Sequence, residues 1–312
     1  LGLSKDIPVS QFPAKLVLEL RSLTRKYYDL TDERSAHINK LKGDLHTVFP
    51  QYLDVFCDVT GKTSTMILRQ YGTPDKILRG HKKTMIEKIS KASRKGLAKA
   101  SERYEKLCAA ANAAKTFGCQ IDSIYFNIFL TLDLVEKLDS ALDSILNRIR
   151  QLITFNKKEK FIQQIKLLNT IPGVGFLTAV TIMCEIGDFS AFRNPKQLFA
   201  YFGLDPEVNE SGKFVGTQLH MSKRGSRIAR RAIFAVALAS IRTKRNGEGI
   251  NPYLRKYYEL KSGQKPKMVA IGAVMHKVCN IVFAVLRDEK AFELRSPEEH
   301  CKQYQRPALA AA

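Results

Sequence analysis

Apolar residues recur at helical spacing in two long stretches of the chain. Between residues 16 and 48 they follow one another at intervals of three and four on both sides of a polar break at residues 31–35, and Pro50 ends the pattern. A second stretch, between residues 135 and 152, repeats this spacing. Alternating strand patterns are scarce, so the sequence predicts a mainly α fold that begins with a long helical segment.

Both stretches have the spacing of a heptad seam. Two seams in one chain favour an antiparallel coiled coil or a dimer stalk, and hence a homo-oligomer. Ordinary amphipathic packing inside one bundle explains the same spacing equally well. Residues 75–115, between the seams, carry 12 Lys or Arg against four Asp or Glu. Such a run is usually a solvated helix face, although its lysines could also reach phosphate.

The organisation of the sequence changes after Phe161, where short apolar stretches begin to alternate with turns marked by Gly and Pro. We find no internal repeat. The predicted divisions are a helical segment at residues 1–74, a basic helical linker with the second seam at 75–164, a C-terminal domain at 165–293 and a tail at 294–312.

The composition points to a folded protein that binds a polyanion. Lys plus Arg number 51 and Asp plus Glu 30, which gives a net charge of +21, and 45% hydrophobic residues are too many for a disordered basic tail. The longest apolar run, from Ala232 to Ile241, is too short to span a bilayer, so no membrane span is expected. Nucleic acid is the expected partner rather than a membrane, and an acidic membrane surface is the second choice. Six cysteines without a CxxC pair argue against a zinc ribbon and favour the reducing cytoplasm.

A turn with two glycines, Gly173 and Gly175, separates two apolar stretches that are predicted to be helices. In a helix-hairpin-helix such glycines let the backbone approach nucleic acid closely, and N–H groups at the start of the second helix bind a phosphate. A plain turn between packed helices has the same sequence. Only the basic surroundings favour the phosphate interpretation.

A basic stripe follows further along the chain. Lys223, Arg227, Arg230 and Arg231 are spaced to fall on one face of a helix, with Arg224 beside them. Cations crowded into the first turn of a helix oppose its dipole, which favours a site that a polyanion occupies. A solubilising face is the alternative.

The loop before the stripe contains Ser211 next to Gly212, with Lys213 close by. A serine on such a turn could attack phosphorus while the cations stabilise the developing charge, and His220 is a conceivable base. Most Ser-Gly sequences, however, are only turns, and a basic loop also explains the histidine.

Several motifs occur together in one order and spacing. They are Ile171-Pro-Gly-Val-Gly175, Glu185-Ile-Gly-Asp-Phe189, Phe199 to Pro206, Glu210-Ser-Gly212, Ser222-Lys-Arg-Gly225, Arg230-Arg231, Asn251-Pro-Tyr253 and Val269 to Lys277. Together they resemble the C-terminal transposase domain of the Piv/MooV-type insertion-sequence transposases, over roughly residues 165 to 293. This bacterial family of DEDD-plus-serine recombinases includes members guided by a bridge RNA. A weaker resemblance, from Leu20 to Pro50, is to the helices that follow the family's RuvC-like domain.

The resemblance implies a function and an active site. The family's serine corresponds to Ser211, which would become esterified to DNA, while four carboxylates of a RuvC-like domain would hold Mg²⁺. No strand that carries such an acid is found here, so we expect a truncated copy and assign no metal ligand in this chain. The implied partners are DNA and, in some members, a guide RNA, and the implied location is the bacterial nucleoid.

The resemblance thus predicts a transposase that cleaves and rejoins DNA, with Gly173, Gly175, Lys213, Lys223, Arg224, Arg227, Arg230 and Arg231 as residues that bind nucleic acid. The alternative is a dimerising fragment that binds DNA or RNA without catalysis.

Overall fold

A computed structural model describes residues 14–119, 121–207, 210–211, 214–215, 220–296 and 298–299. The described residues form thirteen α-helices, a short 3₁₀ helix and one antiparallel pair of two-residue strands. The prediction of a mainly α fold is confirmed.

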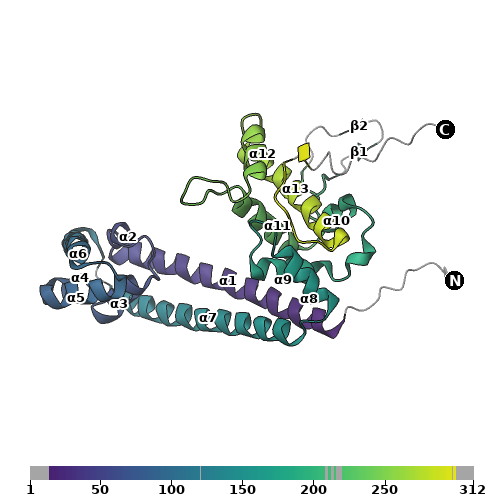
Figure 1. The fold of residues 1–312 in the computed structure, drawn as a ribbon. Coiled ribbons are helices and arrows are strands. Elements are labelled where there is room, and N and C mark those ends of the chain that lie inside the picture. Colours follow the sequence, from purple (N-terminus) through teal and green to yellow (C-terminus); the bar gives the residue numbers. More distant parts are fainter. Residues whose placement is uncertain are drawn as a thin grey trace, which may run out of the picture. The chain divides into compact units, whose positions relative to one another are not determined.

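The chain divides into two compact units (Figure 1). Residues 27–145 form the central unit, and the described residues of 1–26 and 146–312 form the terminal unit. Two long helices, α1 (Lys15–Val48) and α7 (Asp122–Phe155), contribute residues to both. The predicted divisions at residues 75 and 165 lie inside these units, because a change in composition need not coincide with a change in packing partners. Those divisions stay a prediction about sequence organisation.

The central unit contains five helices besides its parts of α1 and α7. They are α2 (Tyr52–Val55), α3 (Lys62–Gln70), α4 (Pro74–Arg79), α5 (Lys82–Ser93) and α6 (Leu97–Phe117). Helix α6 packs against α2, α4 and α5. The basic run predicted from the sequence therefore belongs to the packed helices α4, α5 and α6 of the central unit.

Within the central unit, α1 and α7 run antiparallel. Arg34 on α1 forms an ion pair with Asp139 on α7, and the Tyr125 hydroxyl donates to the Val48 carbonyl oxygen at 3.4 Å. Seam residues of both helices, such as Leu41 and Val135, are buried. The two predicted helices are confirmed, whereas a coiled coil and self-association stay predictions.

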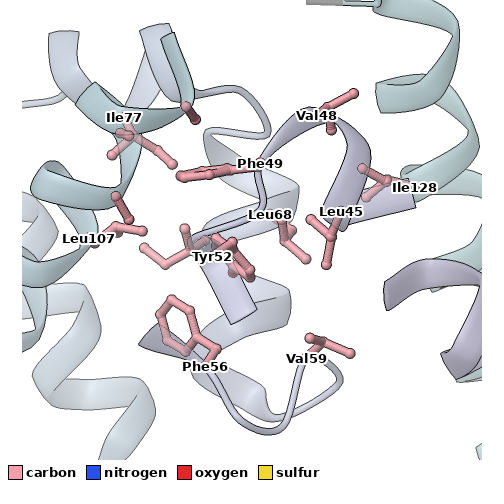
Figure 2. Close-up of a cluster of buried hydrophobic side chains, with 14 of the residues drawn as sticks. Leu45, Val48, Phe49, Tyr52, Phe56, Val59, Leu68, Ile77, Leu107 and Ile128 are labelled. Carbon is pink, nitrogen blue, oxygen red and sulfur yellow. The ribbon is translucent and has the colours of Figure 1, made fainter. Parts of the chain in front are cut away.

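Aromatic packing around Tyr52 fills the core of the central unit. Figure 2 shows Phe49, Tyr52 and Phe56 close together among aliphatic side chains, and the ring centroids of successive pairs are 5.1 and 4.8 Å apart. The buried Tyr52 hydroxyl donates to the Ser64 carbonyl oxygen at 3.0 Å. Burial raises the pKa of Tyr52 above its usual range, so the hydroxyl stays protonated.

The terminal unit contains the remaining elements. These are α8 (Lys160–Leu168), α9 (Phe176–Ile186), the 3₁₀ helix η1 (Phe189–Ala191), α10 (Pro195–Tyr201), β1 (Glu210–Ser211), β2 (Phe214–Val215), α11 (Arg227–Ser240), α12 (Pro252–Ser262) and α13 (Lys267–Asp288). Helix α13 packs against α8, α10, α11 and α12 and is the central helix of this unit (Figure 1).

Helix α13 is, by length and composition, apolar enough to cross a membrane, and it is the one such helix found in the described residues. The sequence analysis did not identify it, because Gly272, His276, Lys277 and Asn280 interrupt its apolar run. More than half of its most apolar stretch is buried inside the unit. The core helix of a soluble domain meets the same criteria, so the finding is weak evidence for a membrane span.

The cysteines of the two units differ in exposure. Cys57 and Cys119 of the central unit are exposed, whereas Cys184 and Cys279 of the terminal unit are buried. Burial raises the pKa of the Cys184 thiol to about 12. Cys301 lies outside the described residues.

Candidate nucleic-acid interface

The turn between α8 and α9 places its two glycines in different surroundings. Gly173 has a φ of +97°, and a Cβ added there would lie 2.5 Å from the Ser240 Oγ at the end of α11. The Ser240 hydroxyl donates to the Pro172 carbonyl oxygen at 3.0 Å. Gly173 is therefore needed for the turn to pack against α11, which is the structural alternative raised by the sequence.

Gly175, by contrast, is exposed and precedes the first residue of α9. It is the N-cap of the helix, no side chain caps it, and a Cβ added there would meet nothing within 4 Å. Arg150 lies near this helix start, with its guanidinium 6.0 Å from the centroid of the Phe176 ring. This end of the turn is open to an anion, although its identity as a helix-hairpin-helix stays a prediction.

Two loops cross at Gly203 and Gly225. A Cβ added at Gly225 would lie 2.0 Å from the Tyr201 carbonyl oxygen, and one at Gly203 would lie 2.4 Å from the Gly225 nitrogen. Backbone hydrogen bonds join the two loops, among them Lys223 N–H to the Gly203 carbonyl oxygen at 3.0 Å. The crossing requires glycine because neither backbone leaves room for a side chain.

The segment between these loops contains the predicted nucleophile. Strands β1 and β2 pair so that Ser211 is opposite Phe214. The loops are joined again just outside this hairpin, where Glu207 N–H donates to the His220 carbonyl oxygen at 2.7 Å. Lys213 lies outside the described residues, and for Ser211 the structure describes the backbone alone. The catalytic role of Ser211 therefore stays a prediction.

One part of the predicted basic stripe is wrong. Lys223 does not lie on the helix, since α11 begins at Arg227 after the capping residue Ser226, whose Oγ accepts from Ala229 N–H at 3.1 Å. Lys223 and Arg224 are exposed in the preceding loop, where Lys223 has a φ of 54°. The spacing suggested one continuous helix, but the serine cap starts the helix one turn later.

The predicted arginines of α11 have different surroundings. Arg227 is exposed, and Arg231 is half-buried. The guanidinium of Arg230 donates to the carbonyl oxygens of Phe202 and Gly225, at 3.2 and 2.7 Å. Arg230 thus holds the loop crossing together, a role that the sequence analysis did not assign to it.

The buried carboxylate of Glu185 lies in the same pocket as Gly225 of the loop crossing. The side chain of Glu185, near the end of α9, is only 2% exposed, and it accepts two hydrogen bonds from Arg25 on α1, at 2.8 and 2.9 Å. Burial by itself raises the pKa of Glu185, but hydrogen bonds from Arg25 and Ser226 outweigh it, so the pKa lies below its usual value. Glu185 is therefore ionised at neutral pH.

A pocket of about 480 Å³ lies in the terminal unit. It is lined by Arg25, Glu185 and Ser226, together with Arg21, Tyr201 and Arg224. Arg21 is oriented by a hydrogen bond from its Nε to the Cys184 carbonyl oxygen at 2.7 Å, and the Tyr201 hydroxyl donates to the Glu185 carbonyl oxygen at 3.1 Å. Three arginines and one glutamate leave the pocket with an excess of positive charge. A phosphate group is the kind of ligand that such a pocket suits.

The sequence analysis missed the roles of Arg21, Arg25 and Glu185. A signal was present, because Glu185 is the one charged residue in the apolar sequence of α9 and a buried carboxylate needs a cationic partner. Sequence alone could not show which cation, since Arg25 is 160 positions away.

No metal site is evident in the part of the chain that the structure describes. None of its His, Cys, Asp and Glu residues form a group of three or more that could hold an ion. The described residues thus offer no ligand set for Mg²⁺, and we assign no step to that ion.

Comparison with known proteins identifies the segment that contains these loops. Residues 165–259 match the Transposase IS116/IS110/IS902 family. The match starts inside α8, ends inside α12 and includes both loops of the crossing. At the level of an insertion-sequence transposase domain, the resemblance found in the sequence is confirmed.

Individual relatives agree with this assignment. The chain is 23% identical over 286 residues to an uncharacterized 43.6 kDa protein of insertion element IS110 from Streptomyces coelicolor, covering 91% of this chain and 66% of the relative. It is 30% identical over 177 residues to a pilin gene-inverting protein of Moraxella bovis, covering 56% and 52%. It is 26% identical over 188 residues to a transposase for insertion sequence element IS1111A of Coxiella burnetii, covering 58% and 50%. The chain thus spans between half and two thirds of these relatives.

Proposed function

We propose that this chain acts in DNA transposition, and that its terminal unit binds the phosphates of DNA. One observation supports the proposal. The segment that matches a transposase family also contains the loop crossing at Gly203 and Gly225, and that crossing contributes to a pocket lined by three arginines. Phosphate contacts of this kind fix the position of DNA without reading its sequence.

The proposed reaction is transesterification at Ser211. The serine oxygen attacks the scissile phosphorus, a phosphoserine ester forms, the bond from phosphorus to one sugar oxygen breaks, and that sugar oxygen takes up the proton. Attack of a sugar hydroxyl on the ester then restores the serine and joins a new strand. Because each step exchanges one phosphate ester for another, no energy-rich cofactor is consumed.

The surrounding residues have proposed roles in binding. Cations of the loops and of α11 would contact the backbone of DNA or of a guide RNA, and the open start of α9 at Gly175 would receive a phosphate. The binding cations are Lys213, Lys223, Arg224, Arg227 and Arg231. Self-association through α1 and α7 and action at the bacterial nucleoid complete the proposal.

The decisive experiment is to trap the covalent intermediate. The whole protein is incubated with DNA that carries the ends of its element, and protein–DNA adducts are detected before and after protease treatment. We expect Ser211→Ala to abolish the protease-sensitive adduct while DNA affinity stays nearly unchanged. Ser144→Ala is the matched control, because Ser144 is exposed on α7 and hydrogen-bonds only within that helix.

Two other results would change the assignment. An adduct that persists in Ser211→Ala would show that another group is the nucleophile. If the unmodified protein forms no adduct but binds DNA with a steep dependence on salt, the chain is a binding module without catalysis.

A further inference from the structure

A second group of cations lies in the central unit, at the hairpin formed by α5 and α6. Lys91, Arg94, Lys95 and Lys99 are exposed, and Arg103 is half-buried. We call these five residues the hairpin cluster. They lie outside the segment that matches the transposase family.

The acids near the hairpin cluster offset its charge only in part, since Glu102 attracts Lys99 and Arg103 as well as its ion-pair partner Lys106. Asp75 pairs with Lys115, and Glu102 pairs with Lys106. Across the described ranges, no carboxylate forms an ion pair with a member of the cluster. Most of the charge of the cluster is therefore available to a ligand, whereas the Arg103 guanidinium also lies 5.6 Å from the centroid of the Phe56 ring.

Three of these cations converge on one depression instead of being spread over the surface. Lys95, Lys99 and Arg103 line a pocket of about 180 Å³ together with Lys106, and its two acids are Asp54 and Glu102. Lys99, Arg103 and Lys106 are spaced by four and three residues, so they follow one face of α6. Over about 10 Å of helix, at ~1.5 Å per residue, this face offers a row of cations along which a phosphate chain could lie.

The turn of the hairpin has a feature in common with the terminal unit. Arg94 ends α5 in the left-handed conformation, with a φ of 53°, as Lys223 does in the loop crossing with a φ of 54°. Glycine would adopt this conformation at lower free-energy cost. In both loops, a long cationic side chain occupies a position that the backbone geometry would assign to glycine.

We propose that the hairpin cluster is a second nucleic-acid-binding surface, which contacts the sugar-phosphate backbone. Protein–protein interfaces are depleted in lysine and built around aromatic anchors, whereas this surface is rich in lysine, and Leu97 is its one strongly exposed large apolar residue among those described. Such a surface binds duplex DNA or structured RNA without reading base sequence. The surface does not depend on the chemistry assigned to Ser211.

The test measures binding of the full chain to a short duplex DNA of arbitrary sequence and to an RNA hairpin, over a range of salt. The variant Lys91→Gln/Lys95→Gln/Lys99→Gln removes three charges of the cluster. We expect the slope of log affinity against log salt to fall by about 2.7 for duplex DNA if each lysine contacts one phosphate, at ~0.9 per contact. If the slope falls with only one of the two nucleic acids, that nucleic acid is the natural ligand of the hairpin cluster.

The matched control is Lys40→Gln/Lys42→Gln/Lys137→Gln, which removes three exposed lysines from α1 and α7 of the same unit. It should leave the slope unchanged, and both variants should keep the helical circular dichroism of the parent. Lysine acetylation of the parent protein provides a local measurement: added nucleic acid should slow acetylation at Lys91, Lys95 and Lys99 but not at the control lysines. Equal slopes in the two variants, or protection by anionic lipid vesicles alone, would overturn the proposal.

Discussion

The central and terminal units both carry clusters of cations, but they use them differently. In the terminal unit, Arg25 is paired with the buried Glu185, and Arg230 is bound to two carbonyl oxygens. In the central unit, Lys95 and Lys99 are exposed, and neither forms an ion pair among the described residues. Charge in a sequence therefore does not identify a binding surface. The cations left over after carboxylates and carbonyl oxygens are satisfied are the better candidates.

The largest effect is expected in the terminal unit, at the glycine whose added Cβ would lie nearest to another backbone. Gly225→Ala should destabilise the terminal unit by about 3 kcal/mol or more, because the new Cβ would overlap the backbone at Tyr201 and the loops would have to separate. Thermal unfolding followed by circular dichroism measures the change. A loss below ~1 kcal/mol would mean that the crossing is not as close as the structure shows.

The ion pairs of the two units should respond differently to loss of charge. Glu185→Gln should cost about 2 to 3 kcal/mol, because it removes charge-assisted hydrogen bonds from a buried site. Asp139→Asn removes the partner of Arg34 in the central unit, and since both side chains are partly exposed it should cost less than about 1 kcal/mol. Denaturant titration of the two variants measures the difference, and equal losses would contradict it.

The same carboxylate predicts a dependence of stability on pH. The pKa of Glu185 is lowered in the folded state, so its contribution is fully present above the ordinary glutamate pKa of about 4.3 and is lost as pH falls through the lower, folded value. The free energy of unfolding of the parent should therefore fall more steeply in acid than that of Glu185→Gln. Parallel acid profiles would show that Glu185 is not the group that titrates.

Substitution of two arginines should distinguish a residue that supports the loop crossing from one that binds DNA. Arg230→Ala should cost about 1 to 2 kcal/mol of stability, because the hydrogen bonds to Phe202 and Gly225 are lost. Arg224→Gln should leave stability within ~0.5 kcal/mol and lower the salt slope of DNA binding by about 0.9. The reverse pattern, with Arg230 affecting only binding, would contradict this division of roles.

The smallest expected effect has the opposite sign. Gly43 lies inside α1 of the central unit, and a Cβ added there would meet nothing within 4 Å. Gly43→Ala should stabilise the protein by about 0.5 to 1 kcal/mol, because alanine favours the helix and restricts the unfolded chain. A shift of the thermal midpoint to lower temperature would show that Gly43 is needed for contacts that the described residues do not include.

Elements set by local spacing were predictable from the sequence. The helix expected between residues 16 and 48 is α1 (Lys15–Val48), and the second seam lies within α7. Both follow from a periodicity that repeats over many turns, so an error at one position does not change the result. The turn at Gly173 was likewise found from its glycines, though its packing against Ser240 was not.

Contacts between distant positions could not be predicted. The pairing of Arg25 with Glu185 and the crossing at Gly203 and Gly225 depend on how helices pack, which no local pattern encodes. The error at Lys223 arose because the spacing of the cations suggested one continuous helix. In the structure, Ser226 caps α11, so the helix begins at Arg227 and Lys223 lies before it. For Ser211, only the backbone pairing with Phe214 is described, so its chemistry still depends on experiment.

The different exposure of the cysteines offers a means of observing the two units separately. A thiol reagent should modify Cys57 and Cys119 at once, whereas Cys184 and Cys279 are protected by burial and by the raised pKa of their thiols. Modification of these two cysteines therefore requires the terminal unit to open. Because Cys108 of the central unit is half-buried, the labelling rate of Cys184 and Cys279 themselves reports how often that opening occurs, without any denaturant.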